Sequence, residues 1–242
     1  MRHRRLPGAL VTATLLLGTL AGTGSHPGTA AGEQKAAPKV VRALTLRDRV
    51  DAASPEALVW KRAPVVRVPL QPAAQVHPVI LGAPSTMSLA VQAIRTPESL
   101  YVRLRWDDPN ADVSINGTGG FLDRVAVQFP INLKPTTTPF MGDPSARVSI
   151  WHWRADGKAE SLVAAGFGSL TPASVQDVRA TGVRTPRGWE VVITRPLRTT
   201  SEDSVRLDGV REIPVAFAVW NGSNQERDGF KAVTLEWWRL RF

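Results

Sequence analysis

The sequence predicts an all-β fold, an antiparallel β-sandwich of about ten strands. Apolar and polar residues alternate with a period of two in many short segments, which is the pattern of strands with one buried face. Nineteen glycines and 19 prolines in 242 residues interrupt these segments, as turns between short strands require. No segment longer than about ten residues shows the period of an amphipathic helix. Together these observations favour a sandwich over a helical or mixed fold.

The alternation places the strands in order along the chain. The clearest strand is 100–106, in which four apolar side chains share one face and Tyr101, Arg103 and Arg105 share the other. Asp107 to Asn110 then ends this strand, and residues 55–58 are compatible with a short helical turn. The other predicted strands are residues 65–68, 87–95, 125–129, 148–153, 175–183, 189–194, 215–220 and 231–240.

Residues 1–30 have the three-part pattern of a secretory signal peptide. Arginines near the start precede an uncharged apolar run, and Gly28-Thr29-Ala30 is a candidate cleavage site. An uncleaved membrane anchor is the alternative, but the run is shorter than the roughly 20 residues that span a bilayer. We therefore expect export to the periplasm or another extracytoplasmic face. Residues 31–43 are expected to form a flexible lead-in, and residues 44–242 the folded domain.

The composition excludes several kinds of function. The chain has no cysteine, which excludes disulfides, thiolate zinc sites, iron–sulfur clusters and covalently attached haem. It carries 30 basic and 21 acidic residues, and removing residues 1–30 leaves 27 basic and 21 acidic residues, a net charge of +6. The basic residues are spread out, so nucleic-acid binding is disfavoured. A solvated basic surface, which could dock an acidic partner, is the simpler interpretation.

Two irregular stretches, residues 132–147 and 221–230, interrupt the strands, and long loops in a compact domain often carry function. Met141 lies in the first, where its thioether either packs or ligates a soft metal or haem iron. Lys231 follows the second and has the parity of Val233. If that face is buried, its ammonium must be paired, neutral or bound to something; alternatively, its amine lies at the rim and reaches water.

His152 is the third candidate, because it lies between two tryptophans on a predicted strand. Its alternatives are a hydrogen-bonded core residue and a metal ligand. Asp107, Asp108 and Asp112 have the spacing of a plain turn rather than of a calcium loop. The sequence contains no serine-hydrolase, zinc-protease, nucleotide-phosphate or dinucleotide motif. We therefore predict no catalytic residue and a protein that is not itself an enzyme.

Five segments, taken together, resemble one family. They are Phe121–Pro130, Met141–Pro144, Ile150–Asp156, Val219–Gly222 and Arg227–Lys231. In these segments the chain resembles the haem b-binding gamma subunits of the type II dimethyl sulfoxide reductase group. That group includes ethylbenzene dehydrogenase, dimethyl sulfide dehydrogenase, and selenate and chlorate reductases. The resemblance covers roughly residues 45–242, which is nearly the whole of the expected domain.

The resemblance implies a β-sandwich whose long loops embrace one non-covalent haem b, with a methionine and a lysine as axial ligands. The matching positions are Met141 and Lys231, and His152 is the substitute should Lys231 fail. With both axial positions filled, electron transfer fits better than substrate turnover. The family passes electrons between an iron–sulfur subunit and an external carrier such as a soluble cytochrome, and the molybdenum chemistry belongs to a further subunit.

A carbohydrate-binding module without haem is the alternative interpretation. Sandwiches of this kind resemble carbohydrate-binding domains, and the eight tryptophans could include platforms on which sugar rings stack. Core packing is the other explanation for these side chains, because Trp106, Trp220 and Trp237 share the parity of apolar neighbours. A third possibility, an independent enzyme, is disfavoured by the lack of a catalytic constellation.

Overall fold

The computed structural model describes residues 38–73, 83–115, 117, 119–134 and 139–242. This part of the chain forms 14 β-strands and one short 3-10 helix, η1, at Leu58–Arg62. No helix within it has the length and hydropathy needed to cross a bilayer. The predicted all-β class is therefore confirmed.

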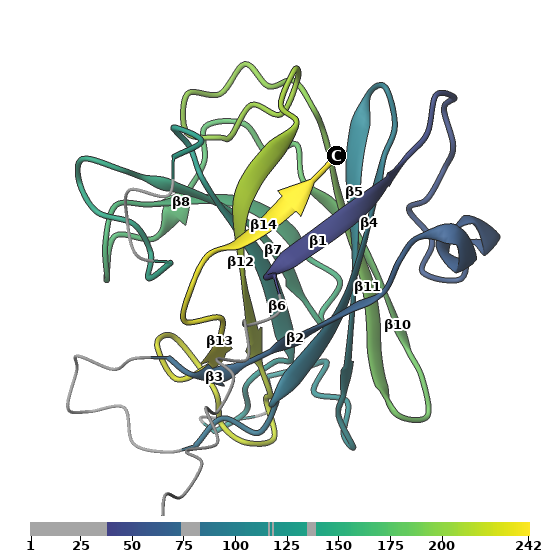
Figure 1. Ribbon diagram of the computed structural model, residues 1–242. Coiled ribbons are helices and arrows are strands. Elements are labelled where there is room, and N and C mark those ends of the chain that lie inside the picture. Colours follow the sequence, from purple (N-terminus) through teal and green to yellow (C-terminus); the bar gives the residue numbers. More distant parts are fainter. Residues whose placement is uncertain (1–37, 74–82, 116, 118, 135–138) are drawn as a thin grey trace, which may run out of the picture. The chain divides into compact units, whose positions relative to one another are not determined.

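The strands are short, and most are antiparallel to their neighbours (Figure 1). Their bounds are β1 Val40–Thr45, β2 Val66–Pro69, β3 Gln71–Pro72, β4 Ser88–Arg95, β5 Ser99–Asp107, β6 Arg124–Pro130, β7 Val148–Arg154, β8 Ala159–Ala164, β9 Thr171–Pro172, β10 Arg179–Arg184, β11 Gly188–Pro196, β12 Glu212–Trp220, β13 Ala232–Val233 and β14 Trp238–Arg241.

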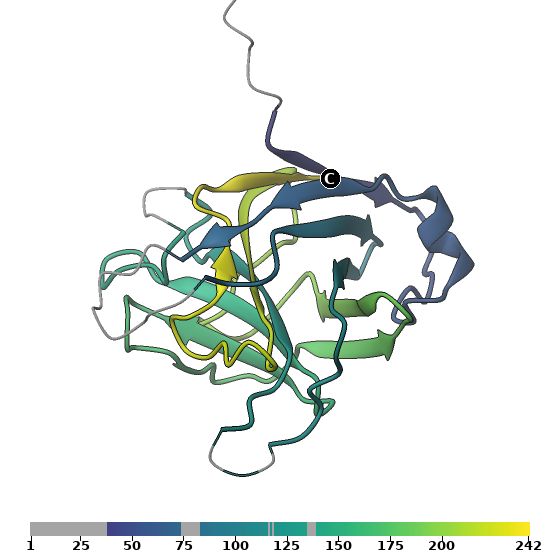
Figure 2. The same ribbon diagram turned by 90° about the horizontal axis from the view of Figure 1, so that it is seen from below.

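The hydrogen-bonded order is β10-β11-β5-β4-β1-β14-β12-β6-β7-β8-β9. We call the part around β4, β5 and β11 the β5 sheet, and the part around β6, β7 and β12 the β6 sheet. Strand β1 joins them, because Val40 to Arg42 pair with β14 and Ala43 to Thr45 pair with β4, both in parallel. Figure 1 shows β1 lying between β14 and β4, and Figure 2 shows the same strands from below.

The main core lies between the inner faces of the two sheets. Its members are the apolar residues that alternate along each strand, such as Val102 and Leu104 of β5 and Val125 and Val127 of β6. Three tryptophans meet there edge to face: the ring centroids of Trp153 lie 6.3 Å from Trp106 and 5.0 Å from Trp189. Burial of these apolar side chains is the main stabilising contribution to the sandwich.

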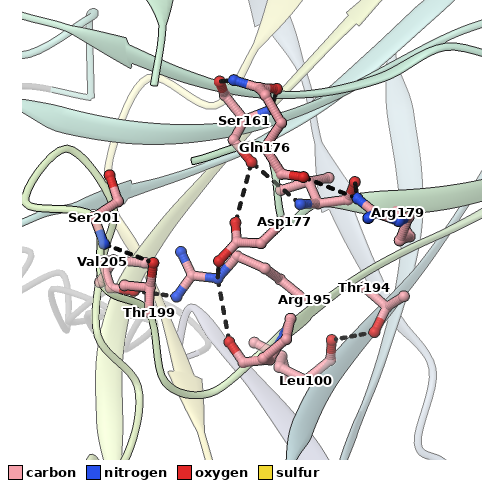
Figure 3. A network of polar contacts seen from close by, with 12 residues as sticks. Leu100, Ser161, Gln176, Asp177, Arg179, Thr194, Arg195, Thr199, Ser201 and Val205 are labelled. Carbon is pink, nitrogen blue, oxygen red and sulfur yellow. Dashed lines mark hydrogen bonds and ion pairs between the residues drawn. The ribbon is translucent and has the colours of Figure 1, made fainter. Parts of the chain in front are cut away.

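A polar network connects β8 to β11 (Figure 3). The Ser161 hydroxyl donates to Asp177 over 3.2 Å, and the Gln176 amide donates to the Ser161 carbonyl over 2.8 Å. Arg195 is buried, lies 3.8 Å from the Asp177 carboxylate and donates to the carbonyl of Val205. The buried guanidinium thus has both a countercharge and a carbonyl acceptor, which a buried charge requires.

The structure differs from the predicted elements at several places. Strand β1 begins at Val40, inside the stretch expected to be a lead-in, and β8 was not predicted. The predicted strand 231–240 is divided into β13 and β14, because Thr234 turns its hydroxyl to the Phe217 amide and Leu235 is exposed. The predicted strand 175–183 begins only at residue 179. Three of the 14 strands, β3, β9 and β13, have only two residues, which accounts for most of the excess over the predicted number of about ten.

Candidate functional site

The outer face of the β6 sheet carries a pocket. Val125, Val127 and Phe129 point into the main core, so the alternate residues Ala126 and Gln128 point outward and line this pocket. Ala216 and Ala218 of β12 line the same pocket, and in register they pair with Gln128 and Ala126. Three alanines on adjacent strands leave space above the sheet that larger side chains would fill.

The walls of the pocket come from loops and from neighbouring strands. Phe140 and Met141 belong to the loop between β6 and β7, and Phe167 to the loop between β8 and β9. The space in this pocket that water-sized molecules can occupy is about 40 Å³, and the wider hollow around it is open to solvent. The lining is almost entirely apolar, and the polar groups that reach it include Gln128 and Lys231.

Met141 is held in a left-handed backbone conformation, with φ of 66°. Gly142 follows with φ of 69°, and a Cβ there would lie 2.7 Å from the carbonyl oxygen of Ala146. The Asp143 carboxylate then accepts hydrogen bonds from the Ser145 amide (2.8 Å) and hydroxyl (2.6 Å), which lower its pKa. This explains the Met-Gly-Asp-Pro segment: glycine permits the turn and aspartate closes it. A non-glycine residue at positive φ stores about 1–3 kcal/mol and often marks a functional site.

Two hydrogen bonds hold the loop that carries Met141 over the pocket. The Gln128 side-chain amide donates to the Pro139 carbonyl over 3.2 Å, from the floor of the pocket. The Met141 carbonyl accepts from the Gly166 amide over 2.9 Å, which joins this loop to the one that carries Phe167. Met141 is therefore positioned by contacts to the sheet and to a second loop.

The loop between β12 and β13 places Lys231 beside the same pocket. Its start is held by Asp123, whose buried carboxylate accepts from the amide of Gly222 over 2.9 Å. Burial raises the pKa of Asp123, while this hydrogen bond and others favour its charged form. The middle of this loop is held by buried Glu226, which accepts from the Asn221 amide over 3.1 Å and from the Ser85 amide over 2.8 Å. These contacts connect segments that are far apart in sequence.

The amine of Lys231 faces Met141 across the pocket. Its Nζ lies 3.9 Å from the Met141 Sδ and 4.9 Å from the ring centroid of Trp220. Among the described residues it forms no ion pair. Burial lowers the pKa of Lys231 to about 8, although the carboxylate of Asp228 acts in the opposite direction. A partly deprotonated amine and a thioether thus converge on one apolar space.

These residues fit a haem group. An amine lone pair and a thioether are both ligands for iron, and an apolar pocket with few polar groups suits a porphyrin ring. A haem ligand at Met141 would explain why its strained backbone is kept. It would also explain why the Lys231 amine has no carboxylate partner among the described residues and lies near the thioether. Met141 and Lys231 would hold the iron, while the alanines of the sheet would face the ring.

His152, the substitute ligand, lies on β7 beside this site but is not among the pocket-lining residues. Its Nδ1 is 3.0 Å from Glu160 Oε2, and its ring meets that of Trp220 edge to face at 5.7 Å. Burial lowers the pKa of His152, which Glu160 partly offsets. The neighbouring groups therefore give His152 the environment of a hydrogen-bonded core residue.

The other candidates do not form sites within the described part of the chain. No group of three or more carboxylates or histidines that could hold a metal ion is found there. Seven of the eight tryptophans are buried, and Trp237 is partly buried. None of them therefore offers an exposed platform for sugar rings, and Trp220 lines the pocket.

Several pocket residues were not predicted from the sequence, notably Gln128, Phe167 and the three alanines. The alanines had a visible signal, because Ala126, Ala216 and Ala218 alternate with large apolar residues in β6 and β12. Small residues at every second position of adjacent strands indicate either a close neighbour or a space. Phe167 had no signal, because its loop has no periodic pattern and is placed over the pocket by the contact of Gly166 with Met141.

The described residues thus form a β-sandwich that brings an amine and a thioether together in an apolar pocket on one outer sheet face. The sequence profile described as ethylbenzene dehydrogenase matches residues 57–176 and 168–232. The chain belongs to the ethylbenzene dehydrogenase family, and within it to the gamma subunits of type II dimethyl sulfoxide reductase enzymes.

Individual relatives support this assignment. The gamma subunit of chlorate reductase from Ideonella dechloratans is 50% identical over 218 residues, covering 89% of this chain and 91% of that protein. A protein of Haloferax mediterranei, named as a haem subunit of respiratory nitrate reductase, is 38% identical and covers 78% of this chain and 67% of its own length. The gamma subunit of dimethylsulfide dehydrogenase from Rhodovulum sulfidophilum is also 38% identical, with 76% and 72% coverage.

Among solved structures, a family 9 carbohydrate-binding module from Caldicellulosiruptor kristjanssonii covers 84% of this chain and 94% of its own. Its sequence identity is 10% and the TM-score is 0.48. Nothing about the ligand of this chain follows from that likeness.

Proposed function

We propose that this chain is an exported haem b electron-transfer subunit, with Met141 and Lys231 as the axial ligands of a single, non-covalently bound haem. The observation that carries the proposal is the approach of Lys231 Nζ to Met141 Sδ, 3.9 Å apart in an apolar pocket. The relatives named as gamma or haem subunits of reductases and dehydrogenases support it.

When bound, the haem would supply a one-electron couple between ferric and ferrous iron. The chain's own residues do the rest of the work. Met141 and Lys231 would hold the iron from both sides and would leave it no open position for a substrate. The apolar lining excludes water, and a thioether ligand is associated with a raised potential. The Trp220 ring and the alanines of the sheet shape the space that the porphyrin would occupy.

The partners follow from the same proposal. The chain lacks cysteines for clusters of its own, so an iron–sulfur subunit would exchange electrons with the haem, and a molybdenum subunit would carry the chemistry. A soluble cytochrome or another external carrier would be the second redox partner. The signal-like residues 1–30 support export to the periplasm, and they lie outside the described residues.

Expression of the full chain with haem supplied tests the proposal. We expect one b-type haem per chain in the exported protein, and reoxidation of the reduced protein by a soluble c-type cytochrome. N-terminal sequencing of the exported protein locates the cleavage site. A folded protein that takes up no haem would exclude the function, whereas haem that only oxygen reoxidises would exclude the electron-transfer role.

A further inference from the structure

Trp220 makes three contacts at the site, with Lys231, Asp228 and His152. It is the last residue of β12, is buried and lines the pocket. The centroid of its ring lies 4.9 Å from the Lys231 Nζ, and its indole Nε1 donates to the Asp228 carbonyl over 3.2 Å. The edge of the ring meets His152 at 5.7 Å. Among the described residues, no other aromatic ring lies over the Lys231 amine.

We propose that Trp220 is the positioning residue of the Lys231 amine, which it holds in place both through its ring and through its indole N–H. This inference rests on the proposed function, since it assigns a role to Trp220 only if Lys231 binds the iron.

The indole N–H acts on the backbone of the loop that carries Lys231. Asp228, three residues before the lysine, has a positive φ of 50°, which a residue with a side chain avoids. The hydrogen bond from Trp220 to its carbonyl fixes this strained turn to the end of a regular strand. Without that hydrogen bond, the turn loses a side-chain contact that connects it to the sheet, and Lys231 is held less firmly.

The ring acts on the amine itself. A lysine side chain has four rotatable bonds and loses much freedom when it is held in one place. Before haem binds, the aromatic face attracts the protonated form of the amine, and packing against the ring limits the side to which either form can turn. On the other side lies Met141. An amine confined between the indole and the thioether is close to the position that a ligand opposite Met141 needs, before any haem arrives.

The two contributions of Trp220 can be separated by substitution. Trp220→Phe keeps an aromatic face and removes the N–H, whereas Trp220→Leu removes both. Trp60 is the matched control, because it is buried on the outer face of the other sheet and donates to the Ala52 (3.2 Å) and Ser54 (3.0 Å) carbonyls. Trp60→Phe and Trp60→Leu remove equivalent contacts far from the pocket.

The measurement is the concentration of free imidazole that replaces the endogenous ligand, followed by absorption and electron paramagnetic resonance of the haem-loaded full chain. We expect Trp220→Leu to need about 5- to 30-fold less imidazole than wild type and to show a partly high-spin haem. The imidazole concentration for Trp220→Phe should lie between those for wild type and Trp220→Leu. The concentrations for the Trp60 variants should match wild type. Thermal unfolding of each apoprotein reports the loss of stability separately.

Wild-type imidazole affinity and spin state in both Trp220 variants would overturn the inference and leave the proposed function intact. If Trp220→Leu does not fold, Trp220→Phe decides alone, and identity with wild type overturns the inference. Equal effects of the Trp60 and Trp220 substitutions would also overturn it, because a general loss of packing would then explain both. A wild-type protein that binds no haem would instead overturn the proposed function.

Discussion

Met141 combines a strained backbone conformation with a side chain that lines the pocket. Its φ of 66° is in the left-handed region, where glycine is the usual residue. The thioether nevertheless contacts the outer cluster of the β6 sheet and faces Lys231. Glycine at this position would relieve the strain but would remove the thioether from the pocket.

Met141→Ala should therefore change the haem spectrum. We expect a mixed or high-spin haem and a lower midpoint potential, because the thioether ligand is lost. Met87→Ala is the control, since Met87 is 63% exposed. Optical titration with dithionite measures both quantities. An unchanged spectrum and potential in Met141→Ala would remove Met141 from the ligand set.

As a ligand of the haem iron, Lys231 would make haem binding depend on pH. Iron binds the free amine, so a proton competes with iron at this nitrogen. Burial lowers the pKa of Lys231 to about 8. Haem affinity should thus fall by up to about tenfold for each pH unit below 8 and level off above it. Competition of haem against apomyoglobin between pH 6 and 10 measures this, and Lys231→Met should abolish the dependence. A flat wild-type profile would contradict ligation by Lys231.

The same shift affects the stability of the apoprotein. The folded pKa lies below the ordinary value of 10.5, so the unfolded chain binds more protons between about pH 8 and that value. Stability from this group should rise with pH across that interval. Lys231→Met should remove this contribution.

At the scale of elements, the loop between β6 and β7 depends on its glycine. Gly142→Ala should destabilise the fold by more than about 1 kcal/mol and displace Met141, because φ is positive and the new Cβ meets the Ala146 carbonyl. Gly157→Ala is a matched control, since Gly157 also has a positive φ, of 85°, but open space around it. Chemical denaturation and the haem spectrum measure the two effects. Equal results in the two variants would show that strain alone acts.

The alanines on the pocket floor allow a second test at the scale of elements. Ala218→Leu should fill the pocket and block haem uptake while the fold is retained, because Ala218 lies on the pocket floor. Ala90→Leu is the control, since Ala90 is partly exposed on the outer face of the β5 sheet. Haem content per folded chain distinguishes them. Full haem content in Ala218→Leu would place the haem elsewhere.

The sequence predicted elements where alternation was strong and missed them where contacts decide. Strand β5 alternates cleanly and was located within one residue at each end. Strand β8 was missed, because its buried half, Ser161 to Ala164, shows no alternation of polar and apolar residues. Lys231 shares a face with Val233, as their parity predicted, but that face is the outer one that lines the pocket, whereas Ala232 belongs to the main core. The position of Met141 opposite it could not be derived, because a loop fixed by Gln128 and Gly166 has no period.

For the whole molecule, the β-sandwich and the family were predicted from the sequence and are confirmed. The role of β1 in joining the two sheets was not predicted. Val41 of β1 is fully buried, and β1 pairs with both sheets, although this stretch reads as the end of a polar lead-in. Its role depends on partners nearly 200 residues away in β14, which local composition does not report.

Binding of one six-coordinate haem between Met141 and Lys231 is what we propose for the whole molecule. The most direct test is the absorption spectrum of the purified exported protein, oxidised and then reduced with dithionite, after expression with haem supplied. We expect a Soret band and sharp α and β bands in the reduced state, as a six-coordinate low-spin haem b gives. A folded, colourless protein that remains colourless after reconstitution with haem would contradict it.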